Sequence, residues 1–283
     1  MIRVLFVVLL FTGFISSGMV FGQSISNKGK LFIIGGGHKP TSLLKQMVRE
    51  AGFKDTDYIM ILPMSSGYPD KAIAEMRKSM SEIGIESCFG INFTNQLTTN
   101  DQKLDSVRKA KLIFISGGDQ SKFMKVVSNT PLESAIKYAL NNGSMIAGTS
   151  AGAAVMSKIM ITGNQLKDTV YSATFKSIRK DNIITESGLG LLQNAIIDQH
   201  FLIRSRHNRL LTAILEYPKN IGIGIDESTA LMVQGNECTI FGESQVLVYR
   251  RGRHFKMKSN NRFSASDIRL DIYVEGEKFN IKN

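Results

Sequence analysis

The sequence predicts a protein of the α/β class, in which a mostly parallel central sheet carries helices on both faces. Short apolar runs alternate with amphipathic segments, and glycine-rich turns follow several of the runs. The runs that predict buried strands are Lys30 to Ile34, Tyr58 to Leu62, Lys111 to Ile115, Ser144 to Ala147, Ala195 to Ile197 and Ile221 to Ile225. The segments with helical spacing are Thr41 to Ala51, Asp70 to Ile83, Leu132 to Asn142 and Arg204 to Glu216. Continuous apolar runs are typical of parallel strands that are covered on both faces.

The pattern changes from Thr229 onward, where short strands with turns replace the alternation of strands and helices. Ala230 to Val233 and Gln245 to Tyr249 are two such strands. We expect them to extend one edge of the sheet or to form a terminal hairpin.

The first 22 residues have the build of a secretory signal peptide. A short basic start precedes the apolar run Val4 to Phe14, and small residues precede a cleavage point after Gly22. Residues 23–283 then form a single catalytic domain, because no linker or shift in composition divides them. The alternative is an uncleaved anchor, since Val4 to Phe21 is nearly long enough to span a bilayer. The short apolar core favours cleavage, so we expect an exported protein, periplasmic or secreted, without a stable membrane anchor.

The chain has a formal net charge of +11 at pH 7. A basic surface attracts polyanions. Nucleic acid is a poor candidate, because no nucleic-acid-binding motif is recognisable and an exported protein does not meet it routinely. Anionic lipid and an acidic polymer stay open as partners of this charge.

Cysteine and histidine usage argues against a metal centre. Cys88 and Cys238 are the only cysteines, their spacing fits no zinc pattern, and the chain has four histidines. We predict no metal and no cofactor. An oxidising compartment would permit one disulfide between the two cysteines.

A Gly-x-Ser-x-Gly pattern at residues 148–152 follows an apolar strand directly. The flanking glycines let the chain turn sharply from strand to helix, so that the hydroxyl of Ser150 stands exposed as a nucleophile. The same short pattern also occurs at tight turns and helix caps without any chemistry. Its interpretation therefore depends on a base and an acid elsewhere in the chain.

His200 is the best candidate for the base, because Asp198-Gln199-His200 ends an apolar run. Asp226 or Glu227, at the end of the next apolar run, would supply the acid that fixes the imidazole tautomer. Carboxyl ends of parallel strands share one edge of a sheet, so these groups can converge with Ser150. Asp198-Gln199-His200 could instead merely cap the helix that starts near residue 204.

The remaining histidines are weaker candidates for the base. An α/β-hydrolase arrangement would pair Asp226 or Glu227 with His254, which lacks a preceding buried strand. His38 follows the first glycine turn, and His207 falls in a predicted helix among arginines.

Two glycine turns also follow predicted strands. Gly35-Gly36-Gly37 fits neither dinucleotide nor Walker patterns, so a close backbone approach at the active-site edge explains it better. Gly117-Gly118 could turn backbone N–H groups toward a developing oxyanion.

Arg204, Arg206 and Arg209 follow the histidine closely. Arginine forks bind carboxylates in a bidentate manner, so one interpretation is recognition of an acidic substrate. The other is an ordinary basic helix end.

At these residues the chain resembles the cyanophycinase branch of the serine peptidases, a family that also includes peptidase E, the aspartyl dipeptidase. The matching motifs are Ile33-Ile34-Gly35-Gly36-Gly37, Ser116-Gly117-Gly118-Asp119-Gln120, Gly148-Thr149-Ser150-Ala151-Gly152-Ala153, Asp198-Gln199-His200-Phe201 with the three arginines, and Gly222-Ile223-Gly224-Ile225-Asp226-Glu227. The Asp-Gln-His-Phe block favours cyanophycinase over peptidase E.

The resemblance implies a flavodoxin-like, three-layer fold similar to the class I glutamine amidotransferase domain, with serine where amidotransferases carry cysteine. It also implies that Ser150 is the nucleophile, His200 the general base and acid, and Glu227 its orienting partner. Backbone N–H groups of Ala151 and Gly118 would form the oxyanion hole. The residues that would shape the substrate pocket are Gln120, Asp198, Gln199, Arg204, Arg206 and Arg209.

Cyanophycin is the substrate that the resemblance implies. It is a polyaspartate backbone with arginine on each β-carboxyl, and an exported serine exopeptidase would cleave it, or related β-aspartyl peptides, to β-aspartyl-arginine dipeptides through an acyl-enzyme. A homodimer is a further expectation from the family. Two alternatives stay open, namely a peptidase E-like dipeptidase acting on α-aspartyl peptides and a non-catalytic exported protein that binds acidic polymers.

Two details stay open within the resemblance. The family has a lysine in the helix after the Gly-Gly-Asp-Gln turn, for which Lys122 and Lys125 are both candidates. Residues 163–182 match no family motif and could line a difference in substrate.

Overall fold

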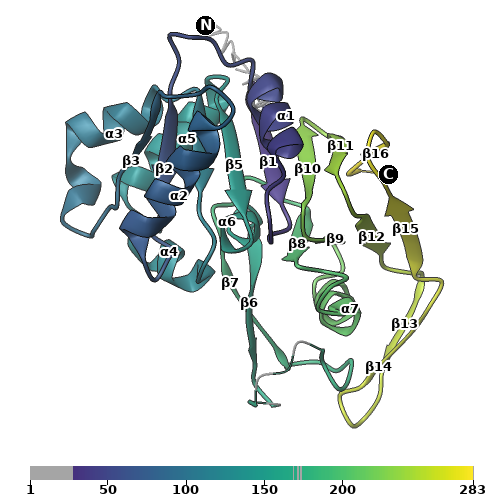
Figure 1. The fold of residues 1–283 in the computed structure, drawn as a ribbon. Coiled ribbons are helices and arrows are strands. Elements are labelled where there is room, and N and C mark those ends of the chain that lie inside the picture. The colour runs from purple at the N-terminus through teal and green to yellow at the C-terminus, as the bar shows by residue number, and fades with distance from the viewer. Residues whose placement is uncertain (1–27, 168, 171, 173, 283) are drawn as a thin grey trace, which may run out of the picture.

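The computed structural model describes residues 28–167, 169, 170, 172 and 174–282. The predicted signal peptide, residues 1–22, lies outside the described residues. The main sheet contains β1 (Lys30–Ile34), β2 (Ile59–Leu62), β3 (Cys88–Gly90), β4 (Leu112–Ile115), β5 (Met145–Thr149), β10 (Thr229–Gln234), β11 (Glu237–Gly242) and β16 (Lys278–Asn280). Their order is β16-β11-β10-β1-β5-β4-β2-β3 (Figure 1). Strands β1 to β5 pair in parallel and the other three antiparallel, which confirms the prediction of a mostly parallel central sheet.

Helices cover both faces of this sheet. They are α1 (Thr41–Ala51), α2 (Pro69–Ser81), α3 (Asp101–Arg108), α4 (Gln120–Val127), α5 (Pro131–Asn141), the short α6 (Ala151–Ala154), and a 3-10 turn at Leu97–Thr99. Successive side chains of a strand point to opposite faces. Accordingly Phe32 and Ile34 of β1 pack in one core with α1 and α2, while Leu31 and Ile33 pack in another with α3, α4 and α5. The three layers thus follow from strands that are apolar on both faces.

A second sheet lies beyond the first and carries part of the site. It consists of β8 (Ala195–Gln199), β9 (Ile221–Ile225), β12 (Val246–Arg250) and β15 (Arg269–Tyr273), in the order β15-β12-β9-β8. One face of it shares the core that contains α3 to α5, and α7 (His207–Glu216) covers the other face. Two hairpins complete the fold, β6 (Ile159–Gln165) with β7 (Ile183–Ser187) and β13 (His254–Met257) with β14 (Phe263–Ser266).

The second sheet was not expected from the sequence. The runs that form β8 and β9 read as buried parallel strands, and they do pair in parallel, but with each other rather than with the main sheet. Strand β1 pairs with β5 on one side and with the antiparallel β10 on the other. The place beside β1 that β9 could have occupied is therefore taken by β10, the strand that follows β9 in the sequence. Of the two strands expected after residue 229, Ala230 to Val233 lies in β10 and extends the main sheet, as predicted. The prediction was wrong for Gln245 to Tyr249, which corresponds to β12 and joins the second sheet.

The turn after β1 joins the two sheets where their strands end. The carbonyl oxygen of Ile34 accepts a hydrogen bond from the N–H of Ser150 at 3.1 Å, and that of Gly35 accepts one from His200 at 2.8 Å. Gly36 accepts a third from Ser228 at 3.1 Å. Three segments far apart in sequence are therefore fixed to consecutive residues of one turn.

The cysteines lie near opposite edges of the main sheet, Cys88 on β3 and Cys238 on β11, and both are free and buried. Six interstrand spacings of ~4.8 Å separate the two strands, about 29 Å in all. A disulfide requires Cα atoms less than about 7 Å apart, so the disulfide that composition permitted does not form within the chain.

In the part of the chain that the structure describes, no helix is long and apolar enough to cross a membrane.

Candidate active site

Ser150 occupies a strained turn between β5 and α6. Its backbone has φ +53° and ψ −109°, a conformation that L-residues adopt only where the surrounding structure enforces it. A Cβ on Gly148 would overlap the carbonyl oxygen of Gly152, and a Cβ on Gly152 would overlap that of Ile115. Both glycines of the motif are thus required for the chain to fold back on itself here. The turn exposes the Ser150 hydroxyl, as the motif predicted.

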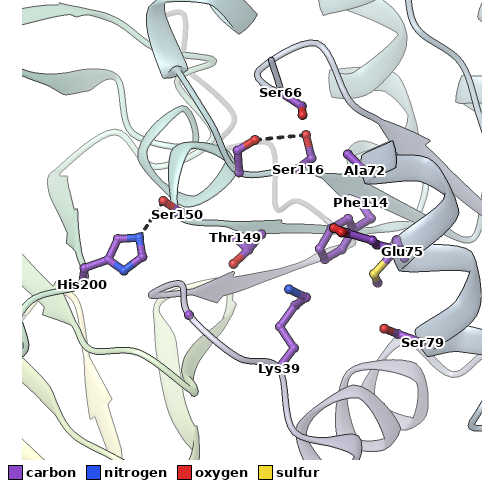
Figure 2. A pocket seen from close by; sticks show the side chains of 13 residues that line it. Lys39, Ser66, Ala72, Glu75, Ser79, Phe114, Ser116, Thr149, Ser150 and His200 are labelled. Atoms are coloured by element: carbon purple, nitrogen blue, oxygen red, sulfur yellow. Dashed lines mark hydrogen bonds between the residues drawn. The ribbon is translucent and has the colours of Figure 1, made fainter. Parts of the chain in front are cut away.

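His200 follows β8 directly and meets this hydroxyl. Its Nε2 lies 2.8 Å from Ser150 Oγ. The dashed line between the two side chains in Figure 2 marks this contact. The side chain of His200 is 10% exposed. Burial lowers the pKa of His200 below its usual value, and the charge of Arg204 contributes to the lowering, while the hydrogen bond to Glu227 opposes it. The ring is therefore held in its neutral form near neutral pH, the form that can accept a proton.

The acid at the other ring nitrogen is Glu227, whose Oε1 is hydrogen-bonded to His200 Nδ1. The sequence left Asp226 and Glu227 open for this position, and the structure distinguishes them. Asp226 Oδ1 accepts hydrogen bonds from the N–H groups of Leu202 and Ile203, at 3.0 and 3.1 Å. Asp226 therefore holds the turn that follows the histidine.

The glycine turn after β1 packs directly on the histidine and its acid. A Cβ on Gly36 would overlap the His200 ring, and one on Gly37 would lie 2.5 Å from Glu227 Oε2. Both glycines also have positive φ, +118° and +68°. The close backbone approach that the sequence suggested for this turn is what the structure shows.

The two N–H groups predicted for an oxyanion hole belong to Ala151 and Gly118. Among the described residues neither N–H has a hydrogen-bond acceptor. Gly118 has φ +136°, and a Cβ there would overlap the carbonyl oxygen of Ser65, so only glycine fits. The preceding Gly117 lies beside the nucleophile, since a Cβ on it would be 3.5 Å from Ser150 Cβ. Unpaired N–H groups next to a serine can stabilise the negative charge of a tetrahedral intermediate.

A pocket of about 290 Å³ opens beside Ser150 and His200. Its other lining residues are Gly37, Lys39, Ser66, Ala72, Glu75, Met76, Ser79, Phe114, Ser116, Gly117 and Thr149. Lys39 and Glu75 bring one charge of each sign into it (Figure 2). Sequence reasoning missed both residues. Lys39 comes just after the β1 glycine turn, so the rule that ligands meet the carboxyl ends of strands could have found it. Glu75 lies in the middle of α2 and gave no signal.

None of the six residues predicted to shape the substrate pocket lines this cavity. Five of the six are buried: Gln120, Asp198, Gln199, Arg206 and Arg209. Asp198 forms a bidentate ion pair with Arg209, and Arg206 donates to the carbonyl oxygen of Gln199 at 2.6 Å. The Gln120 amide donates to the carbonyl oxygens of Ile161 and Thr162, both at 2.8 Å. Arg204 is the exposed one of the six. Their predicted contact with substrate stays a prediction.

The arginines are also not a basic helix end, which was the other interpretation. The helix begins at His207 rather than near residue 204, and Arg206 and Arg209 turn inward to Gln199 and Asp198. Asp198-Gln199-His200 therefore does not cap that helix either.

The other histidines lie away from the serine. His254 of the exposed β13–β14 hairpin pairs with Asp267 at 2.8 Å. It therefore does not pair with Asp226 or Glu227, as an α/β-hydrolase arrangement would require. His207 Nδ1 lies 2.6 Å from the Tyr249 hydroxyl. His38 is exposed.

The sequence left open which lysine reaches the pocket and where the segment 163–182 lies, and the structure bears on both. Lys122 and Lys125 are both exposed, but Lys122 Nζ donates to the carbonyl oxygen of Ser66, a residue that lines the pocket, at 2.6 Å. Described residues of the segment 163–182 contact the β13–β14 hairpin, for example through Lys180 N–H and Asn261 O at 2.8 Å. None of them lines the Ser150 pocket. Within the described residues no group of side chains could hold a metal ion.

The arrangement of hydroxyl, imidazole and carboxylate is suited to acyl transfer. Comparison with known proteins points the same way. A model of peptidase family S51 matches residues 31–241. The chain is 29% identical over 266 residues to the cyanophycinase of Geminocystis herdmanii (strain PCC 6308), covering 90% of this chain and 94% of that protein. It is 26% identical over 168 residues to a peptidase E of Actinobacillus pleuropneumoniae, covering 56% of this chain and 66% of that protein.

Among solved structures, a peptidase from an acI-B1 actinobacterium matches with a TM-score of 0.66 and 22% identity, over 89% of this chain and 96% of that one. At this identity the likeness speaks for the fold alone, and it agrees with the flavodoxin-like α/β prediction.

Proposed function

The chain belongs to peptidase family S51 and is a serine-type peptidase, and we propose that it hydrolyses cyanophycin with Ser150 as its nucleophile. The observation that carries this proposal is the 2.8 Å contact between Ser150 Oγ and His200 Nε2, with Glu227 on the opposite ring nitrogen. The substrate is proposed from the relatives, because cyanophycinases match 90% of this chain. The peptidase E match covers 56% of the chain and so favours the dipeptidase alternative less.

In the first half of the proposed reaction, Ser150 Oγ attacks the amide carbonyl carbon and His200 Nε2 takes the serine proton. Glu227 holds the proton on Nδ1, which leaves Nε2 free to act as the base. The developing oxyanion accepts hydrogen bonds from the N–H groups of Ala151 and Gly118. The imidazolium then gives its proton to the leaving amine, and an acyl-enzyme remains on Ser150.

In the second half, water takes the place of the amine. His200 removes a proton from the water as it attacks the ester carbonyl, and returns the proton to Ser150 Oγ when the product leaves. The lowered pKa of His200 suits this cycle, since the base is regenerated in its neutral form. We propose β-aspartyl-arginine dipeptides as the products.

Two measurements separate this proposal from a dipeptidase. Pure protein is incubated in parallel with cyanophycin and with the α-dipeptide Asp-Leu. Release of β-aspartyl-arginine from the polymer, with Asp-Leu left intact, is the expected result. Cleavage of Asp-Leu with the polymer left intact would replace the proposal by an α-aspartyl dipeptidase.

A serine-reactive fluorophosphonate tests the nucleophile independently of the substrate. The adduct should map to the peptide that contains Ser150 and should be absent in Ser150→Ala. An adduct on another residue, at equal yield in the variant, would reject Ser150.

We further propose that the protein is exported after cleavage of residues 1–22. The basic start, the apolar run and the small residues before Gln23 support this. The N-terminal sequence of the protein recovered from its native compartment should begin at Gln23. A chain that retains Val4 to Phe21 would indicate a membrane anchor instead.

A further inference from the structure

Lys39 brings a positive charge into the pocket that contains Ser150. It follows the glycine turn after β1 and precedes α1, and it lines the cavity together with Ser150 and His200. Figure 2 shows its side chain extending into the space between His200 and α2, with the ammonium group toward Phe114 and Glu75. Among the described residues, no acceptor lies within hydrogen-bonding distance of this ammonium.

The pocket does not compensate this charge well. Lys39 is partly buried, and burial lowers its pKa, whereas the charge of Glu75 opposes the lowering. An ammonium that is partly withdrawn from water and has no acceptor from the protein is less well stabilised than a fully solvated one. An ammonium without a protein partner, in the same pocket as Ser150, is suited to bind an anion that arrives with the substrate.

Glu75 is the acidic residue that lines the same cavity, but it is not a fixed partner of Lys39. Its side chain is 68% exposed, and its carboxylate lies 3.8 Å from the ammonium of Lys71 on the same helix. A carboxylate at the rim, shared with a second lysine and with water, is largely screened.

The remaining polar groups of the cavity also suit an anion. Ser66, Ser79 and Thr149 line it with hydroxyl groups, which can donate hydrogen bonds as well as accept them. An ammonium and hydroxyl donors that line one cavity match a carboxylate, since hydrogen bonds to an ionised acceptor are roughly twice as strong as neutral ones.

We propose that Lys39 binds a carboxylate of the substrate while Ser150 attacks the neighbouring amide. This inference rests on the proposed peptidase function and names the group that the pocket recognises. Two sources of the carboxylate share this chemistry. One is the free carboxyl end of the aspartate backbone, which would direct cleavage to the chain end. The other is the carboxylate of an arginine branch.

The test uses a synthetic fragment of two β-aspartyl-arginine units in three forms. The first has all carboxylates free, the second has the backbone end as a carboxamide, and the third has the arginines as carboxamides. Wild type, Lys39→Met and Lys39→Arg are compared by kcat/KM. Lys71→Met is the matched control, because Lys71 carries the same charge at the rim, 3.8 Å from Glu75, but does not itself line the cavity.

Wild type should lose about 10- to 100-fold in kcat/KM on one of the two amidated forms, mainly through KM. That form identifies the carboxylate. Lys39→Met should lose a similar factor on the free form and then fail to distinguish the free and amidated forms. Lys39→Arg should keep most of the discrimination, and Lys71→Met should behave as wild type. Unchanged discrimination in Lys39→Met would overturn the inference.

Failure of the subsite and failure of the peptidase proposal give different results. If no form is cleaved, calorimetry decides the question. It measures how the β-aspartyl-arginine dipeptide and its carboxamide bind to Ser150→Ala and to Ser150→Ala/Lys39→Met. A preference for the carboxylate that disappears with Lys39→Met supports the subsite even without hydrolysis. Equal binding of both forms to the two variants rejects it.

Discussion

Asp226 and Glu227 are neighbours in sequence, yet their carboxylates hold different parts of the site. Glu227 bonds the imidazole of His200, while Asp226 accepts from the turn at Leu202 and Ile203 and from the Ser244 hydroxyl at 2.8 Å. Asp226 follows β9 directly and Glu227 begins the turn after it, so two adjacent residues can serve both purposes. One carboxylate thus contacts the imidazole that we propose as the base, and the other holds the segment that follows it.

Glu227→Gln and Asp226→Asn should therefore fail in different ways. Glu227→Gln should lower kcat by about 10³- to 10⁴-fold with an unchanged melting temperature, because the amide can hold His200 in the wrong tautomer. Asp226→Asn should lower the free energy of unfolding by about 1–3 kcal/mol through weakened hydrogen bonds, with activity of the folded protein within a few-fold of wild type. Steady-state kinetics and urea unfolding check both. Equal kinetic losses in the two variants would contradict the division of roles.

Much of this site could be predicted from the sequence, because its parts follow strands. The elbow at Ser150 and the polar residues after the runs that form β8 and β9 are local signals, and the rule that parallel strands end at one edge brings them together. What no local signal gave is which of two adjacent acids faces the histidine. That depends on the direction of a single residue at the end of β9.

Other parts depend on tertiary structure that the sequence pattern does not encode. Apolar runs identified β8 and β9 as buried parallel strands but not the sheet to which they belong. The arginines after His200 could be assigned to substrate or solvent from sequence, and instead Arg209 turns inward to Asp198. Lys39 and Glu75 meet in one pocket only because α2 packs beside the β1 turn.

The pH dependence of activity should report the lowered pKa of His200. If the neutral imidazole is the base, as we propose, kcat/KM should rise with pH through a pKa below the usual value of about 6.5. The charge of Arg204 contributes to the lowering, so Arg204→Ala should raise this pKa and move the acid limb to higher pH. Lys45→Ala, on the exposed face of α1, is the control and should leave the limb in place. A limb that moves to lower pH in Arg204→Ala would refute the electrostatic explanation.

The glycines of the elbow should not tolerate a methyl group. In Gly148→Ala the new Cβ would overlap the carbonyl oxygen of Gly152, so the backbone must move. We expect a loss of about 3 kcal/mol or more in the free energy of unfolding, together with loss of fluorophosphonate labelling. Gly67→Ala is the matched control, since a Cβ there meets open space. Urea unfolding measures both variants, and a Gly148→Ala protein as stable as Gly67→Ala would argue against the close packing of the turn.

The ion pair between Asp198 and Arg209 offers a test of how the arginines act. The side chain of Asp198 is 0% exposed and that of Arg209 is 5% exposed, so removal of one charge leaves the other buried. Arg209→Met should cost about 3–5 kcal/mol of stability, and Asp198→Leu in the same chain should restore much of it. If Arg209 binds substrate instead, Arg209→Met should raise KM with little change in unfolding. Urea unfolding and KM measured on the same preparations separate the two roles.

Digestion of cyanophycin by the purified protein, with the masses of the soluble products measured, tests the central claim most directly. Wild type should release a product with the mass of the β-aspartyl-arginine dipeptide. Ser150→Ala, folded to the same melting temperature, should release it at least about 10⁴-fold more slowly. Dipeptide release by Ser150→Ala at the wild-type rate, or an intact polymer after incubation with wild type, would contradict the account.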